Sequence, residues 1–408
     1  MPETVRMRQA DSGGLWNRNF RLFFVARTVA VFGDGMVPVA LAAGLLGAGR
    51  PASSVGYALA AWIGPFAVLV LFGGVLADRF TPRRMMILAD ALRLVGASVL
   101  ALSFAAGDPS VWVVYGLSAV SGVGAALFQP GVASTVPRIA HDIQRANAVL
   151  RVCEALMTMA GPAFAGLVVG LSGGAGAVFA ANAATFGVSG ACMFLLRLSP
   201  VGDPVRRGSL VSELVDGWHE FTARSWLWGV NAIWTVYGLT VAGPMMPLTA
   251  VLVTKGHGAG TYGALMGVHG AGSVAGGLLA LRLRPGRPLA AGAVALLGVV
   301  VNLVVLGLDM SVLALGIGQF AGGAAFAFWL VMWSTTVQTH VPADALNRLH
   351  AYDVSGSLLM MAAGRALAGP VAERVGAEQV LLAGVVIMVA VVGALLGARP
   401  VRELRRVE

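Results

Sequence analysis

The sequence predicts an all-α membrane protein in which twelve transmembrane helices form two pseudo-symmetric bundles of six. Three observations predict this fold: a very apolar composition, twelve long apolar runs and an internal repeat. Of the 408 residues, 57% are hydrophobic and only 12% are charged, and the mean hydropathy is +0.81. A soluble protein of this size needs a polar surface that so few charges do not supply.

Each apolar run is long enough to cross a bilayer as a helix, which takes about 20 residues. The runs lack the period-two alternation of a membrane barrel, and inside lipid such a run satisfies its own backbone only as a helix. The divisions least clearly marked in the sequence are at 171–175, where Ser172-Gly173-Gly174 must turn the chain, and at 281–288. The predicted spans are 20–47, 53–77, 85–106, 111–136, 147–171, 175–196, 226–252, 259–281, 288–308, 311–337, 349–371 and 377–398.

The basic residues between the runs set the orientation. With the N-terminus in the cytoplasm, 21 of the 28 Lys and Arg residues fall in cytoplasmic segments and four lie inside spans. The other three, Arg50, Lys255 and Arg374, fall on the opposite side. Because cytoplasmic loops carry the excess of Lys and Arg, we expect a multi-pass protein of the cell (cytoplasmic) membrane with both termini in the cytoplasm. The net charge of +9 is therefore not taken as a sign of nucleic-acid binding.

A polar connection divides the chain into two halves. We expect residues 1–196 to form an N-terminal six-helix bundle and residues 226–408 to form a C-terminal one. The connection, 197–225, carries Leu210, Leu214, Trp218 and Phe221 at helical spacing. This spacing predicts an amphipathic helix on the inner membrane surface.

The two halves resemble each other when the sequence is shifted by 203 positions. At this offset Gly161-Pro162 faces Gly364-Arg365, and Arg145 faces Arg348. The segments 73–84 and 276–287 also face each other, with glycine pairs and basic residues in register. Parallel six-span repeats are a standard architecture of transporters.

The loop after the second span carries the pattern Gly74-x-x-x-Asp78-Arg79-x-x-x-Arg83-Arg84. This pattern resembles the signature loop of the major facilitator superfamily. Segments 15–22, Gly33-Asp34 and 128–130 further resemble its macrolide-efflux-like and siderophore-exporter-like branch of proton-driven drug antiporters.

The signature loop departs from the superfamily pattern in two places. Thr81-Pro82 stands where Gly-Arg is usual, so a basic residue is lost, although proline still suits a tight turn. The second-half copy has Leu281 at the position of Asp78. Any role that needs the acid therefore belongs to the first loop only.

The resemblance implies a proton-coupled secondary transporter that exports a hydrophobic or amphipathic small molecule by alternating access. Such a cargo would be a drug, antibiotic or secondary metabolite, and the protein would serve multidrug efflux and antibiotic resistance. An importer or facilitator of a small solute is the first alternative, and a non-transporting membrane protein on the same fold is the second.

The sequence lacks common motifs of enzyme active sites and metal sites: it has no H-E-x-x-H, no P-loop and no Cys/His metal spacing. We expect no enzyme activity, no metal and no cofactor. The expected partners are the small-molecule substrate, protons and the lipid bilayer, with no nucleic acid, and the expected state is a monomer.

Asp34 is the leading candidate for proton coupling because it lies near the middle of the first span. Ionisable residues inside a membrane are costly and usually functional. An acid that moves between an apolar environment and the vicinity of an arginine takes up and releases a proton. Arg27 is two helical turns away on the same face, so a fixed Arg27–Asp34 ion pair is the structural alternative.

Further charged residues lie inside the spans. Asp90 and Arg93 are three residues apart, as are Arg151 and Glu154, so intrahelical ion pairs are the simpler interpretation. Asp353 is the acid to test first in the second half. The proton-coupling candidates are thus Asp34, Glu154, Asp353 and Asp90, and the intramembrane basic partners are Arg27, Arg93, Arg151 and Arg365.

Two residues deep in the second half have open roles. Arg365 is a candidate for holding an anionic substrate or a carboxylate from another helix. His269 is either a hydrogen-bonded core residue or part of a proton relay.

The signature loop suggests a conformational role. Gly74 would let the second and eleventh spans approach closely, and Asp78 would hold basic neighbours or face a positive helix N-terminus in one state. Arg79, Arg83 and Arg84 either share that role or only anchor the loop in the cytoplasm.

Gly161-Pro162-x-x-x-Gly166 in the fifth span resembles the helix-bending motif of exporters in this superfamily, because proline removes a backbone hydrogen bond. General use of Gly and Pro in membrane helices is the alternative.

Soft and aromatic side chains in the seventh and tenth spans are candidates for lining an apolar substrate site. Trp329 and Trp333 are excluded from this set because lipid-facing or interfacial positions are the simpler interpretation for them. The possible substrate lining is Asn231, Trp234, Tyr237, Met245, Met246, Phe326 and His269.

Overall fold

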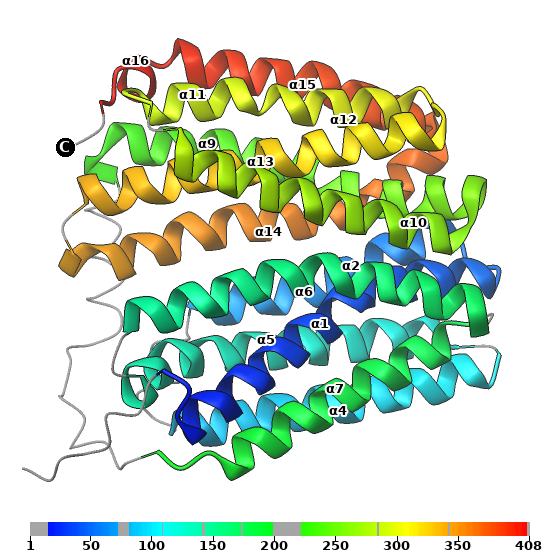
Figure 1. Ribbon diagram of the computed structural model, residues 1–408. Coiled ribbons are helices and arrows are strands. Elements are labelled where there is room, and N and C mark those ends of the chain that lie inside the picture. Colours follow the sequence, from blue (N-terminus) through cyan, green and yellow to red (C-terminus); the bar gives the residue numbers. More distant parts are fainter. Residues whose placement is uncertain are drawn as a thin grey trace, which may run out of the picture.

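The computed structural model describes residues 15–71, 81–107, 109–140, 143–172, 174–198, 222–283, 285–341 and 343–405 (Figure 1). Within these ranges the regular structure is helical, and the long helices run alternately in opposite directions. We call the end of the bundle where α1 begins and α15 ends the termini end, at the left in Figure 1, and the opposite end the far end.

Six long helices come from the first half of the chain and the others from the second. The first-half helices are α1 (Arg18–Gly47), α2 (Ala52–Leu71), α4 (Pro82–Ala105), α5 (Val111–Ile139), α6 (Ile143–Ser172) and α7 (Ala175–Leu195). The second-half elements are α9 (Ser225–Tyr237), the π-helix η1 (Gly238–Ala242), α10 (Gly243–Arg282), α11 (Pro288–Ala295), α12 (Leu297–Gly307), α13 (Val312–His340), α14 (Ala343–Val375), α15 (Ala377–Gly397) and α16 (Arg399–Arg402).

The prediction of twelve spans is confirmed. Ten segments are long and apolar enough to cross a membrane, and one of them, Ser225–Arg282, is 58 residues long. Its middle is broken at Gly258, where φ is 85°, a value that glycine adopts without strain. The chain therefore crosses twice within this segment, as the predicted division between 252 and 259 requires. The helix α14, with 33 residues, is the twelfth span.

Thr81-Pro82, which departs from the signature-loop pattern, lies at the start of a helix. Thr81 is the N-cap residue of α4 and Pro82 is the first residue of that helix. Proline suits this position because its missing N–H would have no partner there. The predicted amphipathic helix in 197–225 lies almost entirely outside the described residues.

Helix packing repeats the offset of 203 positions. A Cβ atom at Gly161 of α6 would lie 3.1 Å from the Cα of Gly35 on α1. A Cβ atom at Gly364 of α14 would lie 3.0 Å from the carbonyl oxygen of Gly238 in η1. Gly161 and Gly364 are 203 positions apart, and so are Gly35 and Gly238. The same close approach of a pair of glycines therefore occurs in both halves.

The two halves meet most extensively along two helix pairs, α2 with α14 and α6 with α10, and α10 makes smaller contacts with α1 and α2. We call these contacts the seam. A Cβ at Gly263 of α10 would lie 2.6 Å from the carbonyl oxygen of Pro162 and 2.7 Å from the Cα of Gly166. At the other pair, Gly56 of α2 lies against the carbonyl oxygen of Arg365. Both approaches are in the far-end half of the helices, so the halves are closely packed there.

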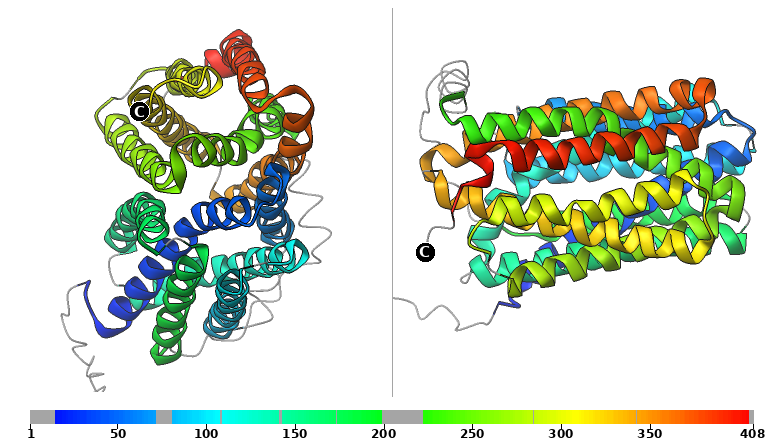
Figure 2. Two further views of the ribbon diagram at one scale, coloured as in Figure 1. Left: turned by 90° about the vertical axis from the view of Figure 1, so that its right-hand side faces the viewer. Right: turned by 90° about the horizontal axis from the view of Figure 1, so that it is seen from above.

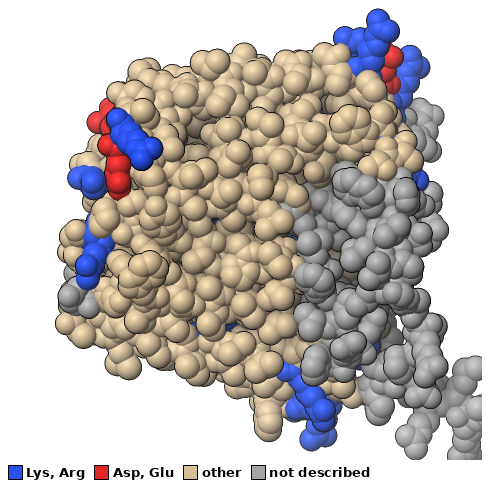
Figure 3. Space-filling model, turned by 180° about the vertical axis from the view of Figure 1, so that it is seen from behind, with Lys and Arg blue, Asp and Glu red and all other residues tan. Residues whose placement is uncertain are grey.

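Figure 2 looks along the helices in its left view, with the helices up to α7 in the lower group and those from α9 onward in the upper group. On the face in Figure 3 the middle of the surface is nearly free of charged side chains, which gather toward the edges. This distribution is typical of a protein surrounded by lipid.

Candidate functional site

One guanidinium and two carboxylates meet inside the first six helices. Arg93 of α4 donates from Nη2 to Oδ1 of Asp90 at 2.6 Å and from Nη1 to Oδ2 of Asp34 on α1 at 3.3 Å. The hydroxyl of Ser189 on α7 donates to Oδ2 of Asp90 at 2.6 Å. We call Asp34, Asp90, Arg93 and Ser189 the Arg93 cluster; it joins three helices.

The surroundings of Arg93 explain how a guanidinium is tolerated there. Its Cζ lies 4.4 Å from the ring centre of Phe186 and 5.1 Å from that of Phe128, and cations are attracted to aromatic faces. Gly124 on α5 makes the room, because a Cβ there would lie 2.8 Å from Cγ of Arg93. A buried charge is costly unless it is paired, and here the pairing is double.

The two acids of the Arg93 cluster differ in access to solvent. The side chain of Asp90 is 0% exposed and that of Arg93 is 2% exposed, whereas that of Asp34 is 29% exposed. With both carboxylates ionised the cluster carries one net negative charge, and one proton makes it neutral. Asp34 is the more accessible of the two carboxylates.

A second group of charges joins α1 to α6. Arg27 Nε lies 2.7 Å from Oε1 of Glu154, and Arg151 Nη1 lies 3.3 Å from Oε2 of Glu154. The alternative of a fixed Arg27–Asp34 pair is therefore wrong, since Arg27 pairs with Glu154 and Asp34 pairs with Arg93. Residues seven apart on one helix are about 10 Å apart along its axis, and neighbouring helices bring closer partners.

The two intrahelical pairs expected from sequence spacing do form. In both cases, however, one member also reaches another helix: Arg93 reaches Asp34, and Glu154 reaches Arg27. Arg151 has an 83% exposed side chain, so its contribution to the pair is weakened by solvent.

Part of the signature loop is described. Gly74, Asp78 and Arg79 lie outside the described residues. Arg83 donates from Nε to the carbonyl oxygen of Met193 at 3.1 Å and from Nη2 to that of Phe194, at the end of α7. The last carbonyls of a helix have no partner within it, so Arg83 caps α7 from α4. Arg84 is exposed.

The Gly-Pro motif of the fifth span lies at a junction of three helices. Gly161 packs against α1, and Gly166 packs against Gly263 of α10. The helix α6 continues through Pro162 to Ser172. The small residues of the motif therefore set the distances from α6 to α1 and to α10.

Aromatic rings from α9 and α13 form one cluster. The ring of Trp234 lies 4.4 Å from Tyr237, 6.1 Å from Phe326 and 5.4 Å from Trp329, measured between centroids. Trp329 stacks on Trp333 at 6.3 Å. Trp329 and Trp333 are 1% and 6% exposed, so the expectation that they face lipid or the membrane interface is wrong. They fill the space between the two helices instead.

The other lining candidates of the seventh span are mostly packed into the interior. Asn231 is buried, and Met245 and Met246 pack against the core. The sulfur of Met245 accepts a hydrogen bond from Nδ2 of Asn302 at 3.8 Å, while Oδ1 of Asn302 is buried without a partner.

Six buried polar side-chain atoms of the second half are unpartnered among the described residues. Besides Oδ1 of Asn302 and the hydroxyls of Thr249 and Thr254, they are Nε of Arg365 on α14, the hydroxyl of Tyr262 on α10 and Nδ1 of His269 on α10. Arg365 is 9% exposed and Tyr262 is 0% exposed. The expectation that Arg365 holds a carboxylate from another helix is not met in the described part of the chain. Asp353 lies on α14, but its side chain is outside the described residues.

Sequence reasoning did not single out Ser189, Tyr262, Asn302 or the two rings beside Arg93. Ser189 and Tyr262 each stand as a polar side chain within an apolar run, which is the signal that could have identified them. The rings carry no such signal, because each of the first six predicted spans contains at least one phenylalanine.

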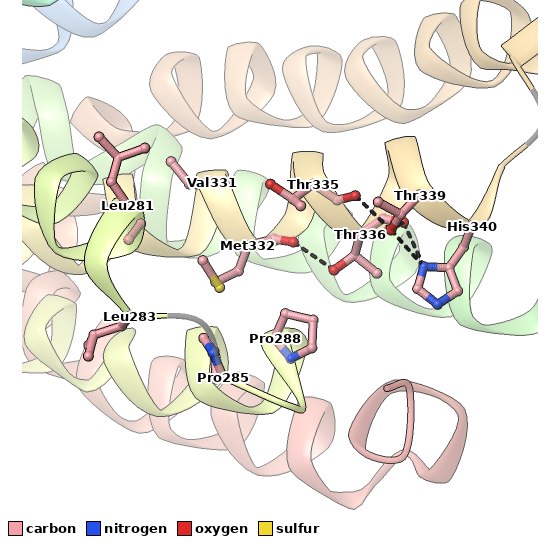
Figure 4. A pocket seen from close by; sticks show the side chains of 11 residues that line it. Leu281, Leu283, Pro285, Pro288, Val331, Met332, Thr335, Thr336, Thr339 and His340 are labelled. Carbon is pink, nitrogen blue, oxygen red and sulfur yellow. Dashed lines mark hydrogen bonds between the residues drawn. The ribbon is translucent and has the colours of Figure 1, made fainter. Parts of the chain in front are cut away.

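A pocket of about 320 Å³ lies at the termini end, between α10, α11 and α13 (Figure 4). The hydroxyls of Thr336 and Thr339 in its wall donate to carbonyl oxygens of their own helix, those of Met332 and Thr335. None of the charged residues discussed above lines it. Among the described residues no group of three or more His, Cys, Asp or Glu could hold a metal ion.

Comparison with known proteins agrees with this arrangement. Residues 12–406 match the model of a family described as transmembrane secretion effectors. The chain is 24% identical to an uncharacterized MFS-type transporter, YvqJ, of Bacillus subtilis (strain 168), over 95% of this chain and 94% of that one. It is 25% identical to the enterobactin exporter EntS of Escherichia coli O1:K1 / APEC, over 86% and 84% of the two chains.

Solved structures show the same fold. The nucleoside transporter NupG superposes with a TM-score of 0.75 at 12% identity, covering 93% of this chain and 98% of that one. A bacterial homologue of the human lysosomal transporter Spinster, in an inward-facing and unoccupied conformation, superposes with a TM-score of 0.68 at 15% identity, covering 96% and 99%.

Proposed function

The chain belongs to the transmembrane secretion effector family of major facilitator transporters, and on that basis we propose that it exports a hydrophobic or amphipathic small molecule in exchange for protons. The proposed setting is the cytoplasmic membrane of the cell, with both termini in the cytoplasm. A drug, antibiotic or secondary metabolite is the proposed cargo, so that the protein contributes to antibiotic resistance and multidrug efflux as a monomer without cofactors.

The Arg93 cluster is the observation that carries the proton-coupling proposal. Two carboxylates share one guanidinium, so the cluster has room for a proton without losing its internal pairing. Only Asp34 combines this pairing with partial exposure. In the proposed cycle Asp34 takes up the proton, its bond to Arg93 weakens, and Asp90 keeps Arg93 in place.

Alternating access is supported by the position of the seam. The close backbone approaches between the halves lie toward the far end, at Gly263 with Gly166 and at Gly56 with Arg365. We propose that this structure is the state open toward the termini end, and that separation of these glycine contacts opens the far end. Rocking of two helix bundles about a central site is the motion proposed for this fold.

Export, as opposed to import, is supported by the name of one relative, the enterobactin exporter. An importer or facilitator of a small solute is the other candidate. In a facilitator Asp34 would be structural, and its neutralisation would leave transport intact.

The proposed coupling is tested in inside-out membrane vesicles that are acidified inside and contain acridine orange. Addition of erythromycin, ethidium or salicylate to wild-type vesicles should release protons for at least one of the three compounds. Asp34→Asn should abolish the release, because an amide cannot carry the proton.

The matched control is Asp309→Asn. Asp309 is exposed, lies between α12 and α13 and has a φ of 45°, a conformation that asparagine also tolerates. Vesicles with this variant should respond like wild type. A wild-type response from Asp34→Asn vesicles would remove Asp34 from the coupling mechanism.

A further inference from the structure

We propose that Arg365 and Tyr262 form a binding site for an anionic group of the cargo, such as a carboxylate. This inference rests on the proposed transport function and deepens it, because it names the chemical class of the transported molecule: an amphipathic organic acid.

The guanidinium of Arg365 is the first reason. It is 9% exposed, its Nε is buried without a hydrogen-bond partner, and no ion pair with a described residue forms. Tyr262 is 0% exposed and its hydroxyl is also unpartnered, and its helix α10 packs against α14, which carries Arg365. A buried, unpaired charge is costly, and an anion with two oxygens would satisfy a guanidinium and a hydroxyl together.

The internal repeat gives a second, independent reason. At the offset of 203 positions, Arg365 corresponds to Pro162. Both residues offer their backbone carbonyl to a glycine across the seam, Pro162 to Gly263 and Arg365 to Gly56. Since a proline serves this packing in the first half, the packing does not require a guanidinium in the second half.

Polar and soft side chains continue from Tyr262 toward the termini end along one face of α10. Tyr262, Met266, His269 and Ser273 recur at helical spacing and share that face. Tyr262 is buried, whereas Met266, His269 and Ser273, which lie progressively nearer the termini end, are half-buried. His269 also has a buried unpartnered Nδ1. A ligand that enters from the termini end would thus pass polar groups before it meets Arg365.

The proposed anion site and the Arg93 cluster lie at similar depth but in different halves. Arg365 is ten residues before the end of α14, and Asp34 is thirteen residues before the end of α1. At 1.5 Å per residue these positions are about 15 and 20 Å from the far ends of their helices. Cargo and proton therefore have separate sites, and each site biases the same rocking motion.

The test measures binding to the purified full-length protein in detergent. Salicylate and salicylamide serve as probes, because they share a ring and differ in the anionic charge. Salicylate should raise the melting temperature of the wild type more than salicylamide does. Arg365→Gln should remove this preference and weaken salicylate binding about tenfold, the effect of losing one charged hydrogen-bonded contact. Arg365→Lys should retain part of the preference for salicylate, because the positive charge is kept.

The control variant is Arg374→Gln, which removes an exposed arginine from the same helix. It should keep the full preference for salicylate. The proposal is overturned if the wild type shows no preference, or if the preference survives in Arg365→Gln.

A purely structural role for Arg365 has a different signature. Arg365→Gln breaks no ion pair among the described residues, so without ligand it should melt at or above the wild-type temperature. A clear fall in the melting temperature together with lost binding would overturn the proposal.

The outcome is separable from that of the proposed function. Binding is measured without a pH gradient, so failed proton coupling leaves the anion site intact. Conversely, proton release by a neutral or cationic compound alone would support coupling and contradict the anion site.

Discussion

At the residue scale, Arg93 serves two carboxylates whose environments differ. Asp90 is fully buried and is held by both Arg93 and Ser189, whereas Asp34 is partly exposed and, among the described residues, is held by Arg93 alone. This asymmetry supports the proposal that Asp90 has a structural role and that Asp34 exchanges the proton. The Asp90–Arg93 contact could be predicted from spacing on one helix. The contacts Arg93–Asp34 and Arg27–Glu154 could not, because they depend on which faces of separate helices meet.

The contribution of Asp90 to the stability of the protein can be measured. Asp90→Ala leaves the buried guanidinium with the longer contact to Asp34 as its one ion pair among the described residues and should cost about 3 kcal/mol of stability. Ser189→Ala removes a single hydrogen bond to the same carboxylate and should cost about 1 kcal/mol. Thermal unfolding in detergent should therefore rank wild type above Ser189→Ala and Ser189→Ala above Asp90→Ala. Equal melting temperatures for the two variants would contradict this assignment.

At the element scale, the long helices follow directly from the apolar runs, since run length and the intervening polar residues mark their ends. The division at Ser172–Gly174 between α6 and α7 was predicted on this ground and is confirmed. The π-helix at Gly238–Ala242 was not predicted, because hydropathy is the same for an α- and a π-turn. Its position against Gly364 is visible only once the helices are packed.

The seam depends on the small residues at the contact of α6 and α10. Gly263→Ala should place a methyl group 2.6 Å from the carbonyl of Pro162, and such overpacking costs about 1–3 kcal/mol. The far-end-closed state should therefore become rarer. In a cysteine-free background with Ser53→Cys at the seam, alkylation should become about tenfold faster.

Gly260→Ala is the matched control on the same helix. Its added methyl group would lie 3.7 Å from the nearest atom, the carbonyl oxygen of Gly166, which is ordinary contact. The alkylation rate of Ser53→Cys should be unchanged in this variant. If both alanine variants accelerate alkylation equally, the tight approach at Gly263 does not hold the halves together.

At the scale of the whole molecule, charge distribution and helix direction agree. Arg18, Arg83 and Arg399 lie at helix ends on the termini side, and Arg50 and Arg374 lie toward the far end. The sequence alone predicted twelve helices in two related halves, because hydropathy and the internal repeat depend only on the order of the residues and not on how the helices pack. The relative placement of the halves could not be predicted, since the seam rests on contacts between residues far apart in the sequence, such as Gly166 with Gly263 and Gly56 with Arg365.

The orientation has a direct test in intact cells. In a cysteine-free background, a membrane-impermeant maleimide should label Asp309→Cys, which lies in an exposed far-end turn. Arg405→Cys, exposed at the termini end, should be labelled only after the cells are permeabilised. The reverse pattern would place the termini outside and would contradict the positive-inside prediction.

The single arginine shared by Asp34 and Asp90 also bears on energetics across the bilayer. In the proposed cycle the Arg93 cluster binds one proton per turnover, and this proton neutralises its single net negative charge. If the cargo leaves with one negative charge while one proton enters, two charges cross in the same electrical sense. An inside-negative voltage then drives both movements, at about 2.3 kcal/mol per charge for each 100 mV. Export would proceed on voltage alone, even where the two sides of the membrane have equal pH.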